Sequence, residues 1–150
     1  MYLRASKYIG GWEHSGEDKE RFKAVLAAAG LPESVATQDS PSLAVRVTVC
    51  YWRKANAIHK WLVDTVQEGK DECQESCVSR EQLGELVALC DSAIATKNAA
   101  LLPPESGFFF GSTDVDEGYW EDLRHTAESV RALLDNPDLK DCAFYYQASW

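Results

Sequence analysis

Apolar residues recur every three or four positions in four stretches of the chain, and this spacing predicts four helices. Helices are expected over residues 17–29 and 51–67, from the capping box Ser79–Gln82 to Ile94, and from Asp114 and Glu117 to Asn136.

Three further segments are rich in β-branched and aromatic residues and predict strands over residues 2–9, 43–49 and 143–147. A lone strand cannot satisfy its backbone hydrogen bonds, so the C-terminal strand is expected beside the N-terminal one. The pattern predicts an α+β fold of about four helices packed on a small antiparallel sheet formed by the N- and C-terminal strands. Residues 31–42 are expected to form a loop, and residues 71–78 are polar and carry no strand pattern.

Composition indicates a globular chain. At 150 residues, with 45% hydrophobic and 26% charged side chains, residues 1–150 are expected to form a single domain. No signal-like start and no run of about 20 apolar residues is present, which predicts a cytoplasmic protein with no membrane contact. The net charge of -9 argues against direct nucleic-acid binding and favours basic partners.

The acidic excess is concentrated near the C-terminus. Between Glu105 and Asp141 ten acids stand against three bases, a net charge of -7. Helical spacing places several of these acids on one face, where they are expected to contact a basic partner, with a merely solvated face as the alternative. The predicted partner-binding residues are Asp114, Asp116, Glu117, Glu121 and Glu128.

A second group of residues is predicted on the helix over residues 51–67. Trp52, Asn56 and His59 share one face of that helix, and Arg53 is adjacent. An amide and an imidazole one turn apart suit directed hydrogen bonds to a ligand, with Trp52 for stacking and Arg53 for an anion. The alternative is that Asn56 and His59 bond to loop carbonyls and fix the packing.

The sequence gives little support for phosphate binding, zinc binding or nucleophilic catalysis. The loop over residues 107–116, GFFFGSTDVD, lacks the lysine of a phosphate-binding loop, and its acids would repel an anion. Cys73 and Cys77 form one loose pair rather than two ligand knuckles, so no zinc is expected with His14, His59 or His125. No nucleophile signature is present, and we predict neither catalytic residues nor a cofactor or metal. All five cysteines are expected to be reduced thiols.

Two segments carry a resemblance to a known family. Residues 51–61, YWRKANAIHKW, and residues 107–114, GFFFGSTD, resemble parts of an uncharacterised family of small tailed-bacteriophage proteins, and the likeness spans residues 43–135. The resemblance implies action in the cytoplasm of an infected bacterium. It implies no activity and no site residues.

Acidity together with this resemblance leads to one functional hypothesis and two alternatives. The hypothesis is a phage-encoded protein that binds and inhibits a host protein with a basic surface, as an anti-CRISPR-like anti-defence inhibitor does. The first alternative is a small enzyme or ligand-binding domain that uses Asn56, His59 and the loop over residues 107–116. The second is a phage morphogenesis or housekeeping protein. The oligomeric state is left open.

Overall fold

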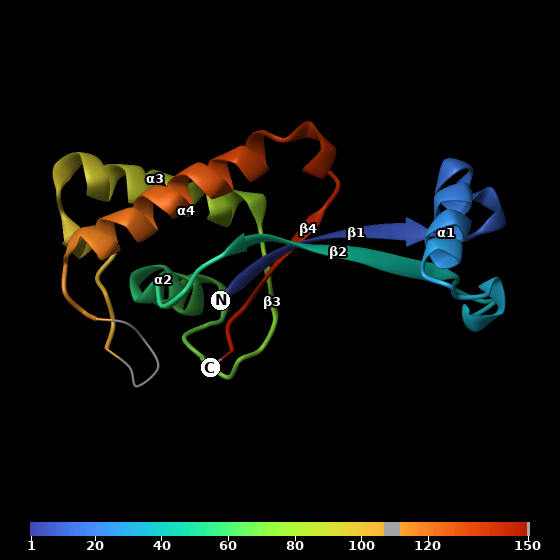
Figure 1. Cartoon of the computed structure of the whole chain (residues 1–150), viewed down its shortest axis with the longest axis horizontal. Coiled ribbons are helices and arrows are strands. Elements are labelled where there is room, and N and C mark those ends of the chain that lie inside the picture. Colours follow the sequence, from blue (N-terminus) through green and yellow to red (C-terminus); the bar gives the residue numbers. More distant parts are fainter. Residues whose placement is uncertain (107–111, 150) are drawn as a thin grey trace. The chain divides into compact units, whose positions relative to one another are not determined.

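The computed structural model describes residues 1–106 and 112–149 and confirms the predicted α+β fold (Figure 1). The α-helices of these residues are α1 (Glu17–Ala28), α2 (Asn56–Val66), α3 (Arg80–Thr96) and α4 (Glu117–Asp135). The strands are β1 (Tyr2–Gly10), β2 (Ser42–Tyr51), β3 (Ser76–Val78) and β4 (Ala143–Gln147).

The four strands form one sheet in the order β2-β1-β4-β3. The C-terminal strand β4 therefore lies beside the N-terminal strand β1, as predicted. Strand β3 was not predicted, because its three residues lie in the polar segment over residues 71–78. It forms by antiparallel pairing with β4, which places Ser76 opposite Tyr146 and Val78 opposite Phe144.

The boundary between β2 and α2 differs from the prediction. We expected a strand over residues 43–49 and a helix from residue 51, whereas β2 continues to Tyr51 and α2 begins at Asn56. Pairing with the N-terminus keeps this part of the chain extended: the Trp52 N–H donates to the Met1 carbonyl oxygen at 3.0 Å, and the Met1 amino group donates to the Trp52 carbonyl oxygen at 3.1 Å. Lys54, with φ +62°, then turns the chain into α2.

The helix starts show one confirmed cap and one displaced cap. The predicted capping box at α3 is present, because the Gln82 N–H donates to Ser79 Oγ and the Ser79 N–H donates to Gln82 Oε1. The cap of α4 is Asp116 rather than Asp114, since Asp116 Oδ1 accepts from the Tyr119 N–H at 3.0 Å.

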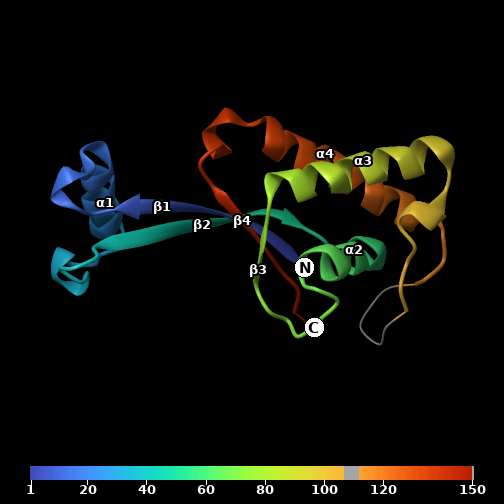
Figure 2. The same ribbon diagram turned by 180° about the vertical axis from the view of Figure 1, so that it is seen from behind.

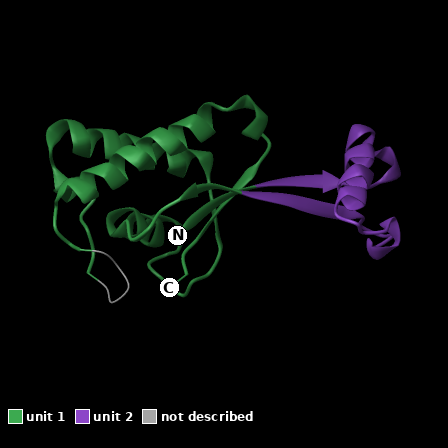
Figure 3. Cartoon of the chain, viewed as in Figure 1, with its two compact units in different colours: residues 1–5, 48–150 green, residues 6–47 purple. Residues whose placement is uncertain are grey.

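The chain divides into two compact units, residues 1–5 with 48–150 and residues 6–47 (Figure 3). In the first unit α3 and α4 lie side by side (Figures 1 and 2), and α2 packs against the same core. Each element of the unit contributes apolar side chains that are fully or almost fully buried. They include Leu3, Ile58, Leu62, Val78, Leu86, Leu123, Val130 and Phe144.

The second unit has a much smaller core. Its buried apolar side chains are Ile9 of β1 with Phe22 and Leu26 of α1. Glycine is required at Gly11, because a Cβ atom there would lie 2.9 Å from the Phe22 ring. The single domain predicted for residues 1–150 stays a prediction, and strands β1 and β2 run through both units.

Among the described residues, no helix combines the length and the apolar character that a membrane span requires.

Truncating the core of the first unit should be costly. Leu86 and Leu123 are each 0% exposed, so Leu86→Ala or Leu123→Ala should lower the free energy of unfolding by roughly 2 to 5 kcal/mol. Urea denaturation followed by circular dichroism measures the loss. Val115→Ala is the control, because Val115 is exposed and its truncation leaves no cavity. A loss below about 1 kcal/mol at Leu123 would contradict this packing.

Candidate functional site

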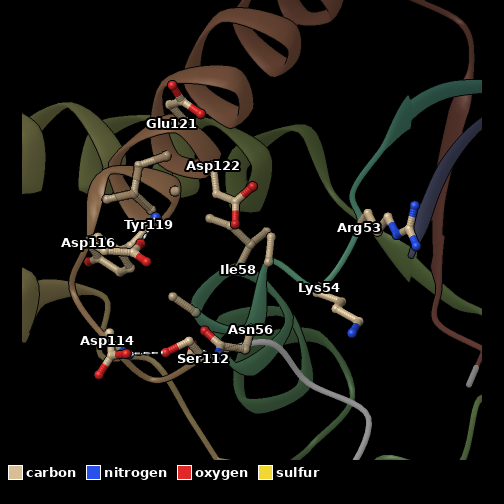
Figure 4. A pocket seen from close by; sticks show the side chains of 14 residues that line it. Arg53, Lys54, Asn56, Ile58, Ser112, Asp114, Asp116, Tyr119, Glu121 and Asp122 are labelled. Carbon is tan, nitrogen blue, oxygen red and sulfur yellow. Dashed lines mark hydrogen bonds between the residues drawn. The ribbon is translucent and has the colours of Figure 1, made fainter.

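A cavity of about 300 Å³ lies in the first unit where the start of α2 meets the first turns of α4 (Figure 4). Residues 53–58 line it from one side, and residues 112–123 contribute the rest. It brings together residues from both predicted groups. Arg53 and Asn56 come from the predicted ligand-binding group, while Asp114, Asp116 and Glu121 come from the predicted partner-binding group.

The side of the cavity formed by α2 is electropositive. Ala55 precedes the helix and has no side chain that can cap it, so the first N–H groups of α2 keep the partial positive charge of a helix start. Arg53 and Lys54 line the same side, and both are exposed. In Figure 4 Lys54 and Asp116 lie on opposite sides of the cavity.

Asn56 is buried, and its amide nitrogen already has a partner in the protein. Asn56 Nδ2 donates to the Ser112 carbonyl oxygen at 2.8 Å. The Ser112 hydroxyl in turn donates to Asp114 Oδ2 at 2.7 Å and accepts from the Asp114 N–H at 3.0 Å. These bonds hold residues 112–114 against α2, which agrees with the packing alternative for Asn56.

The acidic side of the cavity depends on how α4 begins. Asp116 caps the helix, and Tyr119 of the first turn is buried with its hydroxyl donating to the Leu102 carbonyl oxygen at 2.9 Å. These bonds fix the first turn of α4. One turn later Asp122 reaches the same cavity.

Asp122 is the most unusual group of the site. Within the described part of the chain its carboxylate has no hydrogen bond or ion pair, although the side chain points from α4 toward Ile58 of α2 (Figure 4). Burial raises the pKa of Asp122 from 3.8 to about 6, and nearby Glu121 and Asp116 raise it further against the opposing effect of His125. At neutral pH the cavity therefore holds a half-buried carboxylate that no ion pair within the described residues neutralises.

His59 does not face this cavity, although it lies one turn from Asn56. Its Nδ1 lies 2.6 Å from the Tyr146 hydroxyl, and its Nε2 lies 3.1 Å from Asp71 Oδ2. Burial lowers the pKa of His59 despite the opposing effect of Asp71, so the ring is neutral: Nε2–H donates to Asp71, and Tyr146 donates to Nδ1. The structure thus separates His59 from Asn56.

Trp52 and Arg53 also lie elsewhere than on the helix predicted over residues 51–67. Trp52 precedes α2 and is not on the helical face predicted for it, because α2 begins four residues later. Its ring is only 2% exposed, and Nε1 donates to Thr126 Oγ1 of α4 at 2.8 Å. Arg53 is exposed beside the cavity.

The predicted acidic face is present along α4, with one correction. Glu117, Glu121 and Glu128 are exposed on the helix, and Glu117 forms an ion pair with Arg124. Asp114 and Asp116 precede α4, which begins at Glu117, so the predicted partner-binding acids do not all share one helical face. Asp114 and Asp116 are nevertheless exposed beside the cavity.

The loop predicted over residues 107–116 lies partly outside the described residues, which resume at residue 112. All five cysteines are free thiols: Cys50 and Cys90 are buried, Cys73 and Cys142 are half-buried, and Cys77 is exposed. Among the described residues, no three acidic, cysteine or histidine side chains gather as metal ligands would.

The sequence did not indicate the role of Asp122 in the cavity. It also did not indicate that Asp71, Thr126 and Tyr146 form hydrogen bonds with His59 or Trp52. The burial of Thr126 could have been inferred, because it is a polar residue beside the apolar stripe of α4. Asp122 precedes the core residue Leu123, which places it at the edge of that stripe. Asp71 and Tyr146 lie 12 and 87 residues from His59, so no local spacing indicates them.

Comparison with known proteins adds no relative: no protein-family model, curated protein or solved structure matches the chain.

Asp122→Asn should stabilise the protein at neutral pH. Because the folded protein binds more protons at Asp122 than the unfolded chain between pH 3.8 and about 6, the ionised carboxylate destabilises the fold above that window. Removing the charge should therefore raise the free energy of unfolding at pH 7 by up to about 1 kcal/mol, a value reduced for partial solvent access. Urea denaturation at pH 7 and pH 4 measures this, with a much smaller gain expected at pH 4. A loss of stability at pH 7 would show that the carboxylate has a stabilising partner.

Proposed function

We propose that the protein binds a basic surface of a host protein and blocks it, with the cavity between α2 and α4 as the centre of the contact. The single observation that supports this most is the unneutralised carboxylate of Asp122 inside an acid-lined cavity. A group of this kind lowers the stability of the free protein and is retained at binding sites, where a ligand compensates it.

A guanidinium or ammonium group of the partner is the expected occupant. A cation that enters the cavity restores the electrostatic stabilisation that Asp122 loses on burial. Its attraction to a partly buried carboxylate is stronger than its attraction to a fully hydrated one. Asp116 and Glu121 line the same cavity and add to the attraction. Arginine suits the site best, because its planar fork can bond Asp122 in a bidentate way.

The rest of the acidic surface would guide the partner to the cavity. Glu121 and Glu128 are exposed on α4, and residues 105–141 carry a net charge of -7. The negative electrostatic potential of these acids accelerates the approach of a basic surface and repels phosphate backbones. A protein is therefore favoured over a nucleic acid as the direct partner.

The electropositive side of the cavity adds selectivity. Arg53, Lys54 and the start of α2 line the same cavity as the acidic residues, and the charged ends of Arg53 and Lys54 point away from these acids in Figure 4. A partner surface with an acidic residue beside its basic one would complement both sides, whereas a uniformly basic surface would meet repulsion from Arg53 and Lys54.

The biological setting rests on the resemblance to tailed-bacteriophage proteins. In that setting the partner is a protein of the bacterial cytoplasm, and blocking a defence protein, in the manner of an anti-CRISPR protein, is the form of inhibition that we propose. The bonds of Asn56 to Ser112 and of His59 to Tyr146 and Asp71 give no specific support to the alternative of an enzyme.

Charge reversal on α4 should slow association with the partner. The partner is first captured from bacterial lysate on the immobilised protein and identified by mass spectrometry. Surface plasmon resonance then compares the parent with Glu121→Lys/Glu128→Lys at low and high salt. We expect the on-rate of this double variant to fall roughly tenfold at low salt and the difference to shrink at high salt.

A matched double variant and a single variant complete the design. Glu68→Lys/Glu85→Lys changes the net charge equally at exposed positions outside α4 and the cavity, so its on-rate should stay close to the parent value. Asp122→Asn should raise the dissociation rate while the protein stays folded. Equal rates for the parent and all variants would contradict the proposed site.

A further inference from the structure

Strand β2 is an edge strand of the sheet. Among the residues that the structure describes, β1 is its neighbour on one side and no strand lies on the other. Within the second unit its segment 42–47 is largely exposed, with Val45 38% and Val47 56% accessible. An edge strand presents a row of backbone N–H and C=O groups that another strand can bond.

The sequence of β2 lacks the features that usually protect such an edge. The strand SLAVRVTVCY contains no proline, no lysine and no acidic residue, and Arg46 is its only charged residue. Its β-branched valines and threonine favour an extended, pairing-competent backbone. An exposed edge strand with few charged residues can pair with another strand unless charges, proline or a covering element block it.

The segment is complementary to itself. In an antiparallel pair related by a two-fold axis at Val45, Leu43 lies opposite Val47 of the second copy, and Ala44 lies opposite Arg46 of that copy. Leu43 then faces Val47 and Val45 faces Val45, so these pairs are apolar, and no like charges stand directly opposite each other. Such cross-strand pairs stabilise a sheet.

The distribution of charge favours a second copy over an external basic strand at this edge. Residues 6–47 contain five bases and six acids, a net charge of -1, whereas the remaining residues contain ten bases and eighteen acids, a net charge of -8. Self-association through the second unit therefore brings together surfaces that carry little net charge, whereas a basic peptide would be attracted to the first unit.

We propose that β2 pairs with β2 of a second copy, so that the protein forms a symmetric dimer through the edge segment 42–47. This pairing supplies partners for the backbone groups of the edge and covers Val45 and Val47. It is independent of the proposed binding of a host protein, because it uses neither α4 nor the cavity.

Light scattering with size-exclusion chromatography on the full chain tests the proposal. The parent should show twice the monomer mass of 16.7 kDa and dissociate on dilution. Val45→Lys places like charges opposite each other at the two-fold axis, so the dimer dissociation constant should rise roughly tenfold or more. Val35→Lys is the matched control, because Val35 is 58% exposed in the same unit but outside β2, and it should leave the dimer unchanged.

Hydrogen exchange by mass spectrometry gives a second readout. Amides of segment 42–47 should exchange more slowly as the parent is concentrated, and this protection should be absent in Val47→Lys. If circular dichroism shows that Val45→Lys does not fold, the mass of Val47→Lys and the exchange data test whether the dimer forms through segment 42–47. A mass of 16.7 kDa at every concentration overturns the proposal. A dimer that persists in both lysine variants also overturns it, as does a monomer whose β2 pairs with a peptide of another protein.

Discussion

Burial of one face of α4 is the constraint on which the site depends. Leu123, Ala127 and Val130 are almost completely removed from water, and the Trp52 indole donates to Thr126 between them. Together they fix the rotation of α4 about its axis. Asp122 immediately precedes Leu123, so the rotation that buries Leu123 also draws the Asp122 carboxylate partly out of water. The hydrophobic core thereby creates the electrostatic property that the proposed function uses.

The buried polar groups near the cavity illustrate two different outcomes of burial. Asn56 and His59 have protein partners, and their bonds join α2 to residues 112, 71 and 146. Such bonds compensate the cost of burying polar groups and specify the packing. Asp122 has no compensating bond within the described residues. This contrast distinguishes groups that maintain the fold from the group that a partner would compensate under the proposed function.

Local patterns predicted much of the fold, and the failures have non-local causes. The apolar periodicity of α4, the capping box of Ser79 and Gln82, and the pairing of the terminal strands followed from sequence and are confirmed. The start of α2 was misplaced because pairing of Trp52 with Met1, 51 residues away, extends β2. The same shift removed Trp52 from the predicted helical face. Predicting Asp122 required knowing that α2 approaches α4, which no spacing within α4 reveals.

Titration of the Asp122 carboxyl carbon by nuclear magnetic resonance tests the central claim most directly. Carbon-13 labelling of the aspartates, with Asp122→Asn to assign the signal, gives the pKa of this group in the folded protein without knowledge of the partner. A midpoint near 6 is predicted, because the carboxylate is partly buried and unneutralised. A midpoint near the ordinary value of 3.8 would mean that the carboxylate is hydrated or already paired, and it would contradict the account.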